Sequence, residues 1–136
     1  MKKFIAILCC LITLFSTTAH AALPSDDDTI VSPMWDNIRN MTTTITKSSD
    51  TTAIANGIAR KQTSASSIEG TLTVYEFKNG AWMFVTESHK SVTSGSLSIS
   101  IEFAAQSGVK YKSVFDVIAY NGTEPEYASC EYEKTI

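Results

Sequence analysis

The chain has 136 residues, a net charge of −3 at pH 7 and 43% hydrophobic residues. This length supports one domain built around a single core. The acidic balance and the lack of a basic cluster argue against two classes of partner: nucleic acids, where Lys and Arg neutralise phosphates, and anionic membranes.

Residues 1–21 have the three parts of a secretory signal peptide. Lys2 and Lys3 give a positive start, residues 4–15 form a largely apolar run, and Ala19-His20-Ala21 forms a small-x-small cleavage site. The apolar run is shorter than the roughly 20 residues that a membrane-spanning helix needs. Cleavage near Ala21 therefore predicts a secreted, extracellular protein with no membrane span.

Removal of the signal leaves nine basic and fourteen acidic residues, a charge of −5. Cys9 and Cys10 leave with the signal, so Cys130 remains as a single thiol and no disulfide within the chain is expected. A lone thiol in an exported protein is either buried or available for an intermolecular bond, and we favour burial. An exported chain without disulfides that begins Met-Lys-Lys is typical of bacteria.

The mature part is divided into a leader and one domain. Residues 22–32 contain Pro24 and three consecutive aspartates, which predict a flexible acidic leader, and residues 33–136 form the domain. Apolar and polar residues alternate most clearly in 96–103 and again in 109–120, the pattern of half-buried antiparallel strands. Gly70, on the apolar side of the run 68–77, predicts a close approach from an opposing sheet. Seven strands are expected, over 41–47, 52–60, 67–77, 81–91, 97–103, 109–120 and 127–134.

Seven short strands in about 100 residues indicate an all-β antiparallel sandwich of immunoglobulin or fibronectin type III style, with a small open barrel as the alternative. Asn79-Gly80 is a strong hairpin signal, and residues 48–50 and Asn121-Gly122 mark further turns. Tyr111, at the start of the sixth strand, suits a tyrosine corner, whose hydroxyl bonds back to the backbone.

The segment Ser32 to Ile38 contains the pattern Pro-x-Trp-x-x-Ile ahead of a Thr-rich strand. Together with the hairpin at 79–82 and the strands at 96–100 and 109–112, it resembles a family of small secreted β-sandwich proteins of unknown function from Gram-positive anaerobic bacteria. The resemblance covers most of the mature chain. It implies a sandwich fold, an extracellular address and no assigned activity. Relatives often carry a Cys in the second strand, where this chain has Ile54 and Ala55.

The residues needed for catalysis are scarce. His89 is the one histidine outside the signal, and neither a nucleophile motif nor a Cys-His signature accompanies it. Two Cys and His side chains are too few for structural zinc, and no phosphate-binding Gly-rich loop is present. Seven acids are interpreted as solvated strand or terminal charges: Glu69, Glu76, Glu102, Glu124, Glu126, Glu131 and Glu133. No catalytic residue, metal or cofactor is expected, and the protein is predicted not to be an enzyme.

Binding is the better hypothesis. Tyr75 and Phe77 lie on the parity opposite the apolar side of their strand, and Trp82 and Phe84 lie across the turn. Tyr75, Phe77 and Trp82 are the candidate ligand-binding residues, for an extracellular glycan or protein. The alternative is that the rings only cover one another as cross-strand pairs, or pack beneath the leader near Trp35.

We therefore predict a secreted, non-enzymatic binding module that acts outside the cell or at its surface. A stand-alone carbohydrate-binding module is the first alternative. A small exported protease inhibitor or enzyme is the second, for which residues 62–67 and 120–127 are the loops long enough to serve.

Overall fold

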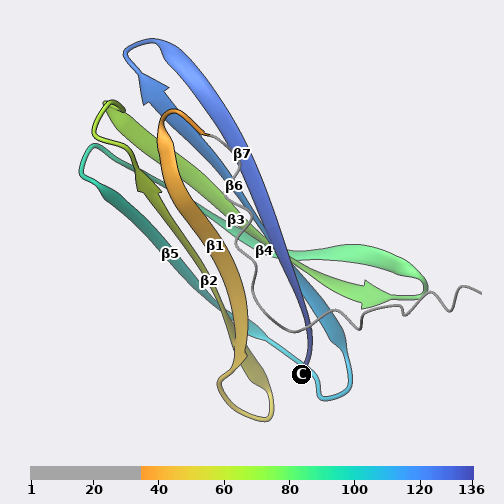
Figure 1. Cartoon of the computed structure of the whole chain (residues 1–136). Helices are drawn as coiled ribbons and strands as arrows, with labels where there is room; N and C mark the ends of the chain where they lie inside the picture. The colour runs from red at the N-terminus through yellow and green to blue at the C-terminus, as the bar shows by residue number, and fades with distance from the viewer. Residues whose placement is uncertain (1–34) are drawn as a thin grey trace, which may run out of the picture. The chain divides into compact units, whose positions relative to one another are not determined.

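The computed structural model describes residues 35–136, which form two packed antiparallel sheets (Figure 1). The predicted all-β sandwich is confirmed. The seven strands are β1 (Ile38–Lys47), β2 (Thr52–Lys61), β3 (Ser67–Lys78), β4 (Ala81–Val92), β5 (Ser96–Ala104), β6 (Lys110–Asn121) and β7 (Glu124–Thr135). The predicted signal peptide and acidic leader lie outside the described residues. Within 35–136, no helix is long and apolar enough to span a membrane.

One sheet has the order β1-β2-β5 and the other the order β4-β3-β6-β7. Every neighbouring pair is antiparallel. The alternation predicted from the sequence decides which side of each strand faces the core. On β5 the apolar residues Leu97, Ile99, Ile101 and Phe103 are all buried between exposed neighbours. The fourth strand pairs with the third, whereas in a constant-type immunoglobulin domain the fourth strand pairs with the fifth.

Phe115 of β6 fills the middle of the core and is fully buried. A Cβ atom on Gly70 would lie 2.7 Å from Leu97 of the opposing sheet and 2.8 Å from the Phe115 ring, so the predicted close approach at Gly70 is confirmed. Gly57 of β2 plays the same part in the other sheet, where an added Cβ would lie 2.8 Å from Phe115. The two glycines make room for one large ring, although no sequence pattern predicts this role for Gly57.

Two tight turns connect neighbouring strands of the larger sheet. Asn79 and Gly80 both have positive φ (54° and 80°), which is the type I′ geometry expected for Asn-Gly between strands. At the other turn, Asn121 pairs with Glu124 and Gly122 has φ 64°. The interpretation of residues 120–127 as a long loop was therefore wrong, because this segment is a hairpin with a two-residue connection.

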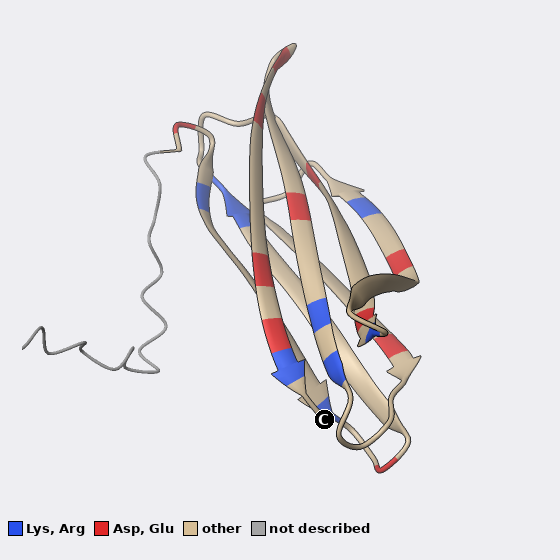
Figure 2. Ribbon diagram, turned by 90° about the vertical axis from the view of Figure 1, so that its right-hand side faces the viewer, with Lys and Arg blue, Asp and Glu red and all other residues tan. Residues whose placement is uncertain are grey.

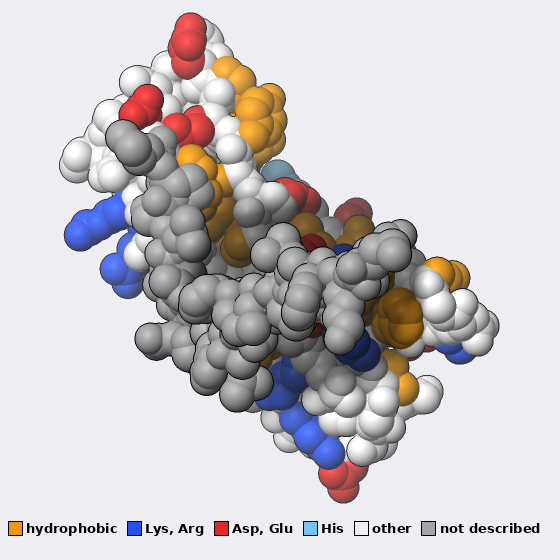
Figure 3. All heavy atoms as spheres, turned by 45° about the vertical axis from the view of Figure 1, so that its right-hand side comes forward, with side chains coloured by type: hydrophobic (Ala, Val, Ile, Leu, Met, Phe, Trp, Pro, Cys, Tyr) orange, Lys and Arg blue, Asp and Glu red, His pale blue; other side chains and the backbone are white. Residues whose placement is uncertain are grey.

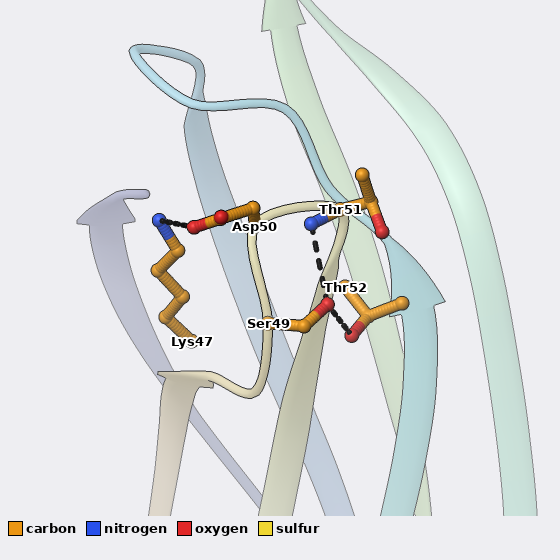
Figure 4. A network of polar contacts seen from close by, with 5 residues as sticks. All are labelled: Lys47, Ser49, Asp50, Thr51 and Thr52. Atoms are coloured by element: carbon orange, nitrogen blue, oxygen red, sulfur yellow. Dashed lines mark hydrogen bonds and ion pairs between the residues drawn. The ribbon is translucent and has the colours of Figure 1, made fainter.

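The β1–β2 turn, predicted at residues 48–50, is held by polar contacts (Figure 4). The Ser49 hydroxyl lies 2.6 Å from the Thr52 hydroxyl and accepts a hydrogen bond from the Thr51 N–H at 3.2 Å. Lys47 and Asp50 form an ion pair at 3.2 Å. These contacts satisfy groups that the bend removes from the strand ladder.

Tyr111 lies at the start of β6, is buried, and its hydroxyl accepts a hydrogen bond from the Gln106 N–H at 3.0 Å. The predicted bond back to the preceding backbone is therefore present. Deeper in the core, the Thr43 hydroxyl of β1 lies 2.9 Å from the Ser113 hydroxyl of β6 and donates to the Asn56 carbonyl at 3.0 Å. This polar pair links the two sheets without leaving a buried group unsatisfied.

Glu126 of β7 fastens the beginning of β1. Its carboxylate accepts hydrogen bonds from three successive backbone N–H groups, those of Asp36 (2.8 Å), Asn37 (2.9 Å) and Ile38 (2.9 Å). The interpretation of Glu126 as a solvated charge was wrong. Strand parity turns its side chain to the inner side of β7, where the N–H groups that precede β1 need an acceptor.

Candidate binding surface

The β3–β4 hairpin projects from the sandwich, as the end of these two strands in Figure 1 shows. Its bend coincides with a β-bulge: Val74 pairs with Thr86, but the next pair is Tyr75 with Phe84, so Val85 is an extra residue on β4. A bulge kinks its strand and increases the local twist. Between this bulge and the turn at the tip, Tyr75 pairs with Phe84 and Phe77 pairs with Trp82. All four side chains point outward from the sheet.

Four aromatic residues form two cross-strand pairs on the outer face of this hairpin. Tyr75 and Phe84 have ring centroids 6.4 Å apart at 80°, and Phe77 and Trp82 have centroids 5.1 Å apart at 62°. Both are edge-to-face geometries. Phe77 remains 44% exposed and Phe84 60% exposed, whereas Tyr75 and Trp82 are half-buried. The rings thus cover one another as cross-strand pairs and still present apolar surface to solvent.

Trp82 is further covered by two lysines of β6. The Nζ atoms of Lys112 and Lys110 lie 4.6 Å and 5.7 Å from its ring centroid, within the range of cation–π attraction. Lys112 pairs with Glu131 at 3.6 Å, and Lys110 pairs with Glu133. Figure 2 shows these basic positions of β6 beside acidic positions of β7 near the end of the chain. The indole therefore lies within a network of contacts and is not a free stacking platform.

Sequence reasoning missed a further large apolar residue of the hairpin that is exposed, Met83. It lies opposite Glu76 on the reverse face and is 51% exposed. The period-two pattern predicts which side of the strand Met83 lies on, but not whether that side is covered. The inner side is buried only where the opposing sheet packs against it, and the hairpin extends beyond that sheet. Together, Phe77, Met83 and Phe84 form an accessible apolar end, which we call the hairpin patch. Hydrophobic side chains also reach the surface at the right-hand end of the view in Figure 3.

The residues considered for catalysis lie apart. His89 is exposed on the outer face of β4, 3.1 Å from the Thr71 hydroxyl. Cys130 is a half-buried free thiol on β7, at the opposite edge of the same sheet, with its side chain packed against the core. Burial raises the pKa of Cys130 to about 11, and nearby Asp116 adds to the shift. No Cys–His pair forms, and within residues 35–136 no three His, Cys, Asp or Glu side chains gather as metal ligands.

Comparison with family models and with curated proteins finds no match for this sequence. Among solved structures, the fold is similar to a crystal structure of a protein from Archaeoglobus fulgidus. The TM-score is 0.36 at 12% sequence identity, over 73% of this chain and 97% of that one. The resemblance to the Gram-positive family thus stays a prediction.

Proposed function

We propose that the protein is an exported, non-enzymatic binding module whose hairpin patch contacts a protein partner outside the cell. The observation that carries this proposal is the accessible apolar surface of Phe77, Met83 and Phe84 on a projecting hairpin. Aromatic residues and Met are enriched in the cores of protein interfaces, and exposed apolar patches mark interaction sites.

A protein partner suits this patch better than a glycan. Sugar recognition combines a free aromatic face with polar groups that bind hydroxyls. The exposed side chains of the patch carry no hydrogen-bonding groups, and the Trp82 indole is covered by Phe77 and the lysines. β4 also lies at the edge of its sheet, so its backbone offers unpaired groups to an added strand.

The extracellular address rests on the signal-peptide pattern of residues 1–21 and on the family resemblance. We further propose that the sandwich is nearer to the fibronectin type III kind than to the constant-type immunoglobulin kind. The pairing of β4 with β3 supports this assignment.

The alternative functions lack comparable support. An inhibitor needs a rigid exposed loop, but residues 120–127 are a hairpin, and Ala65 in the loop 62–66 is buried, with the Ser66 N–H bound to the Tyr120 carbonyl at 2.7 Å. An enzyme needs a reacting group beside a base, and His89 and Cys130 lie at opposite sheet edges.

The test uses residues 22–136, which contain all the residues that the structure describes, 35–136. Labelled protein is titrated onto bacterial surface preparations before and after proteinase digestion. The partner proposal predicts saturable binding that digestion removes, and at least a tenfold loss in the Phe77→Ala/Phe84→Ala variant, as for interface hot spots. Ile58→Ala, which removes an exposed apolar side chain from β2 in the other sheet, is the control and should bind normally. Equal binding by the double variant would refute the proposal, as would digestion that leaves intact the part of the binding that the double variant loses.

A further inference from the structure

A second accessible region lies on the same face of the larger sheet, on the far part of β6 and β7. A depression of about 380 Å³ lies there, within the size range of small-ligand pockets. Two adjacent cross-strand pairs project outward into it, Asp116 with Ser129 and Ile118 with Tyr127. Tyr127 is 68% exposed, the highest value among the large hydrophobic residues of 35–136 that are exposed. In Figure 3 hydrophobic side chains also reach the surface toward the upper end.

We propose that this depression is a binding site for a neutral saccharide, centred on Tyr127, Asp116 and Ser129. The face of an aromatic ring is electron-rich and attracts the C–H bonds of a pyranose. A carboxylate accepts hydrogen bonds from sugar hydroxyls and binds them more strongly than a neutral acceptor does. A serine hydroxyl both donates and accepts. The combination differs from the hairpin patch, which offers apolar groups alone.

The neighbouring carboxylate is already engaged, which leaves Asp116 for the ligand. Glu69, on the other side of Ile118, accepts a hydrogen bond from the Tyr120 hydroxyl at 2.8 Å. This bond raises the pKa of Tyr120 and keeps its hydroxyl protonated as the donor. Among the ion pairs within 35–136, none involves Asp116, whose side chain is exposed.

A row of polar side chains extends the site across the sheet. Asp116 pairs on one side with Ser129 and on the other with Thr71, which pairs in turn with His89. Four strands at about 4.8 Å spacing give the row a span of about 14 Å, longer than one sugar ring. We therefore expect an oligosaccharide to bind more tightly than its monosaccharide. The carboxylates of Asp116 and Glu69 disfavour anionic sugars, so the ligand class is neutral.

The experiment is an NMR titration of ¹⁵N-labelled residues 22–136 with four neutral tetrasaccharides: maltotetraose, cellotetraose, mannotetraose and chitotetraose. At least one should shift the backbone amides of 116–118 and 127–129, with weaker or no binding by the matching monosaccharide. Tyr127→Ala should lower the affinity at least tenfold, and Asp116→Asn severalfold. Phe84→Ala, in the hairpin patch, is the matched control and should leave the affinity unchanged.

Because Tyr127 and Asp116 are exposed, both variants should retain the circular dichroism spectrum of the parent protein. Absence of amide shifts with all four sugars at millimolar concentration would overturn the proposal, as would shifts that Tyr127→Ala leaves intact. Equal or tighter binding of polygalacturonate would overturn the neutral ligand class. If Tyr127→Ala instead abolishes proteinase-sensitive binding to surface preparations, the depression is a protein contact and the saccharide proposal fails.

Discussion

Removal of the Glu126 carboxylate should weaken the attachment of β1 to β7 by an amount that the hydrogen bonds define. The N–H of Asp36 is exposed, so water replaces the carboxylate there at little cost. The N–H groups of Asn37 and Ile38 are partly buried, and leaving such a group unsatisfied costs about 1–2 kcal/mol each. We therefore expect Glu126→Ala to lower the free energy of unfolding by about 2–4 kcal/mol, a large share of the roughly 5–15 kcal/mol of a typical domain. Glu126→Gln keeps an acceptor oxygen but loses the charge, and should cost about 1 kcal/mol.

Urea unfolding of the three proteins measures these differences, and native-state hydrogen exchange locates them. Exchange should accelerate most at the amides of Asn37 and Ile38 in Glu126→Ala. Glu124→Ala, an exposed carboxylate on the same strand, is the control and should change stability by less than about 0.5 kcal/mol. A loss below about 0.5 kcal/mol in Glu126→Ala, with unchanged exchange at the two amides, would show that the carboxylate does not hold this segment.

Three further perturbations test the core. Gly57→Ala places a Cβ 2.8 Å from the Phe115 ring and should cost about 1–3 kcal/mol in urea unfolding, whereas Gly95→Ala, with open space around it, should cost little; equal effects would contradict the packing described. Tyr111→Phe deletes the acceptor of a partly buried N–H and should lower the melting temperature by several degrees, about 1 kcal/mol, and an unchanged melting temperature would argue against this bond. At pH 8 the thiol of Cys130, whose pKa is raised to about 11, should react slowly with a disulfide reagent until denaturant is added. The thiol loses its proton at a lower pH in the unfolded state than in the folded state. The free energy of unfolding of the parent, relative to that of Cys130→Ser, should therefore fall between about pH 9 and about pH 11. Rapid labelling of the native protein, or a difference that does not change with pH, would count against burial.

The strands were predictable because their signal is local. Each of the seven expected runs corresponds to a strand. Alternation specifies which side of a strand faces the core, and Gly-containing turns specify the register of a hairpin, and both are visible within one segment of the sequence. The errors are at boundaries. The first strand begins at Ile38 because Glu126, 88 residues away, satisfies the N–H groups before it. The last begins at Glu124 because a two-residue turn replaces the expected loop. Both depend on pairing that a single segment does not reveal.

The binding surface was only partly predictable. Parity placed Tyr75 and Phe77 outward, and the structure has them there. It did not reveal that Trp82 is covered by Lys112 or that Met83 is exposed, because both follow from the bulge and from the projection of the hairpin beyond the opposing sheet. The sequence pattern predicts Tyr127 only as the first residue of a strand. Its value as a platform depends on Asp116 and Ser129, which the β6–β7 register brings alongside.

The two surfaces differ in chemistry, and Phe77, Phe84 and Tyr127 all lie on the outer face of the larger sheet. On β6, Lys112 lies beside the aromatic pairs of the hairpin, and Ile118 lies beside Tyr127. These two positions are six residues apart, so the two surfaces are separated by about 20 Å at 3.3 Å per residue. Phe84 and Tyr127 point away from the core, so each contributes to folding only through its cross-strand pair, about 0.2–1 kcal/mol. Substitution at either position therefore separates recognition from stability. An apolar patch without polar groups selects a protein surface, and a ring beside a carboxylate and a hydroxyl selects a sugar, so one module has room to hold both at once.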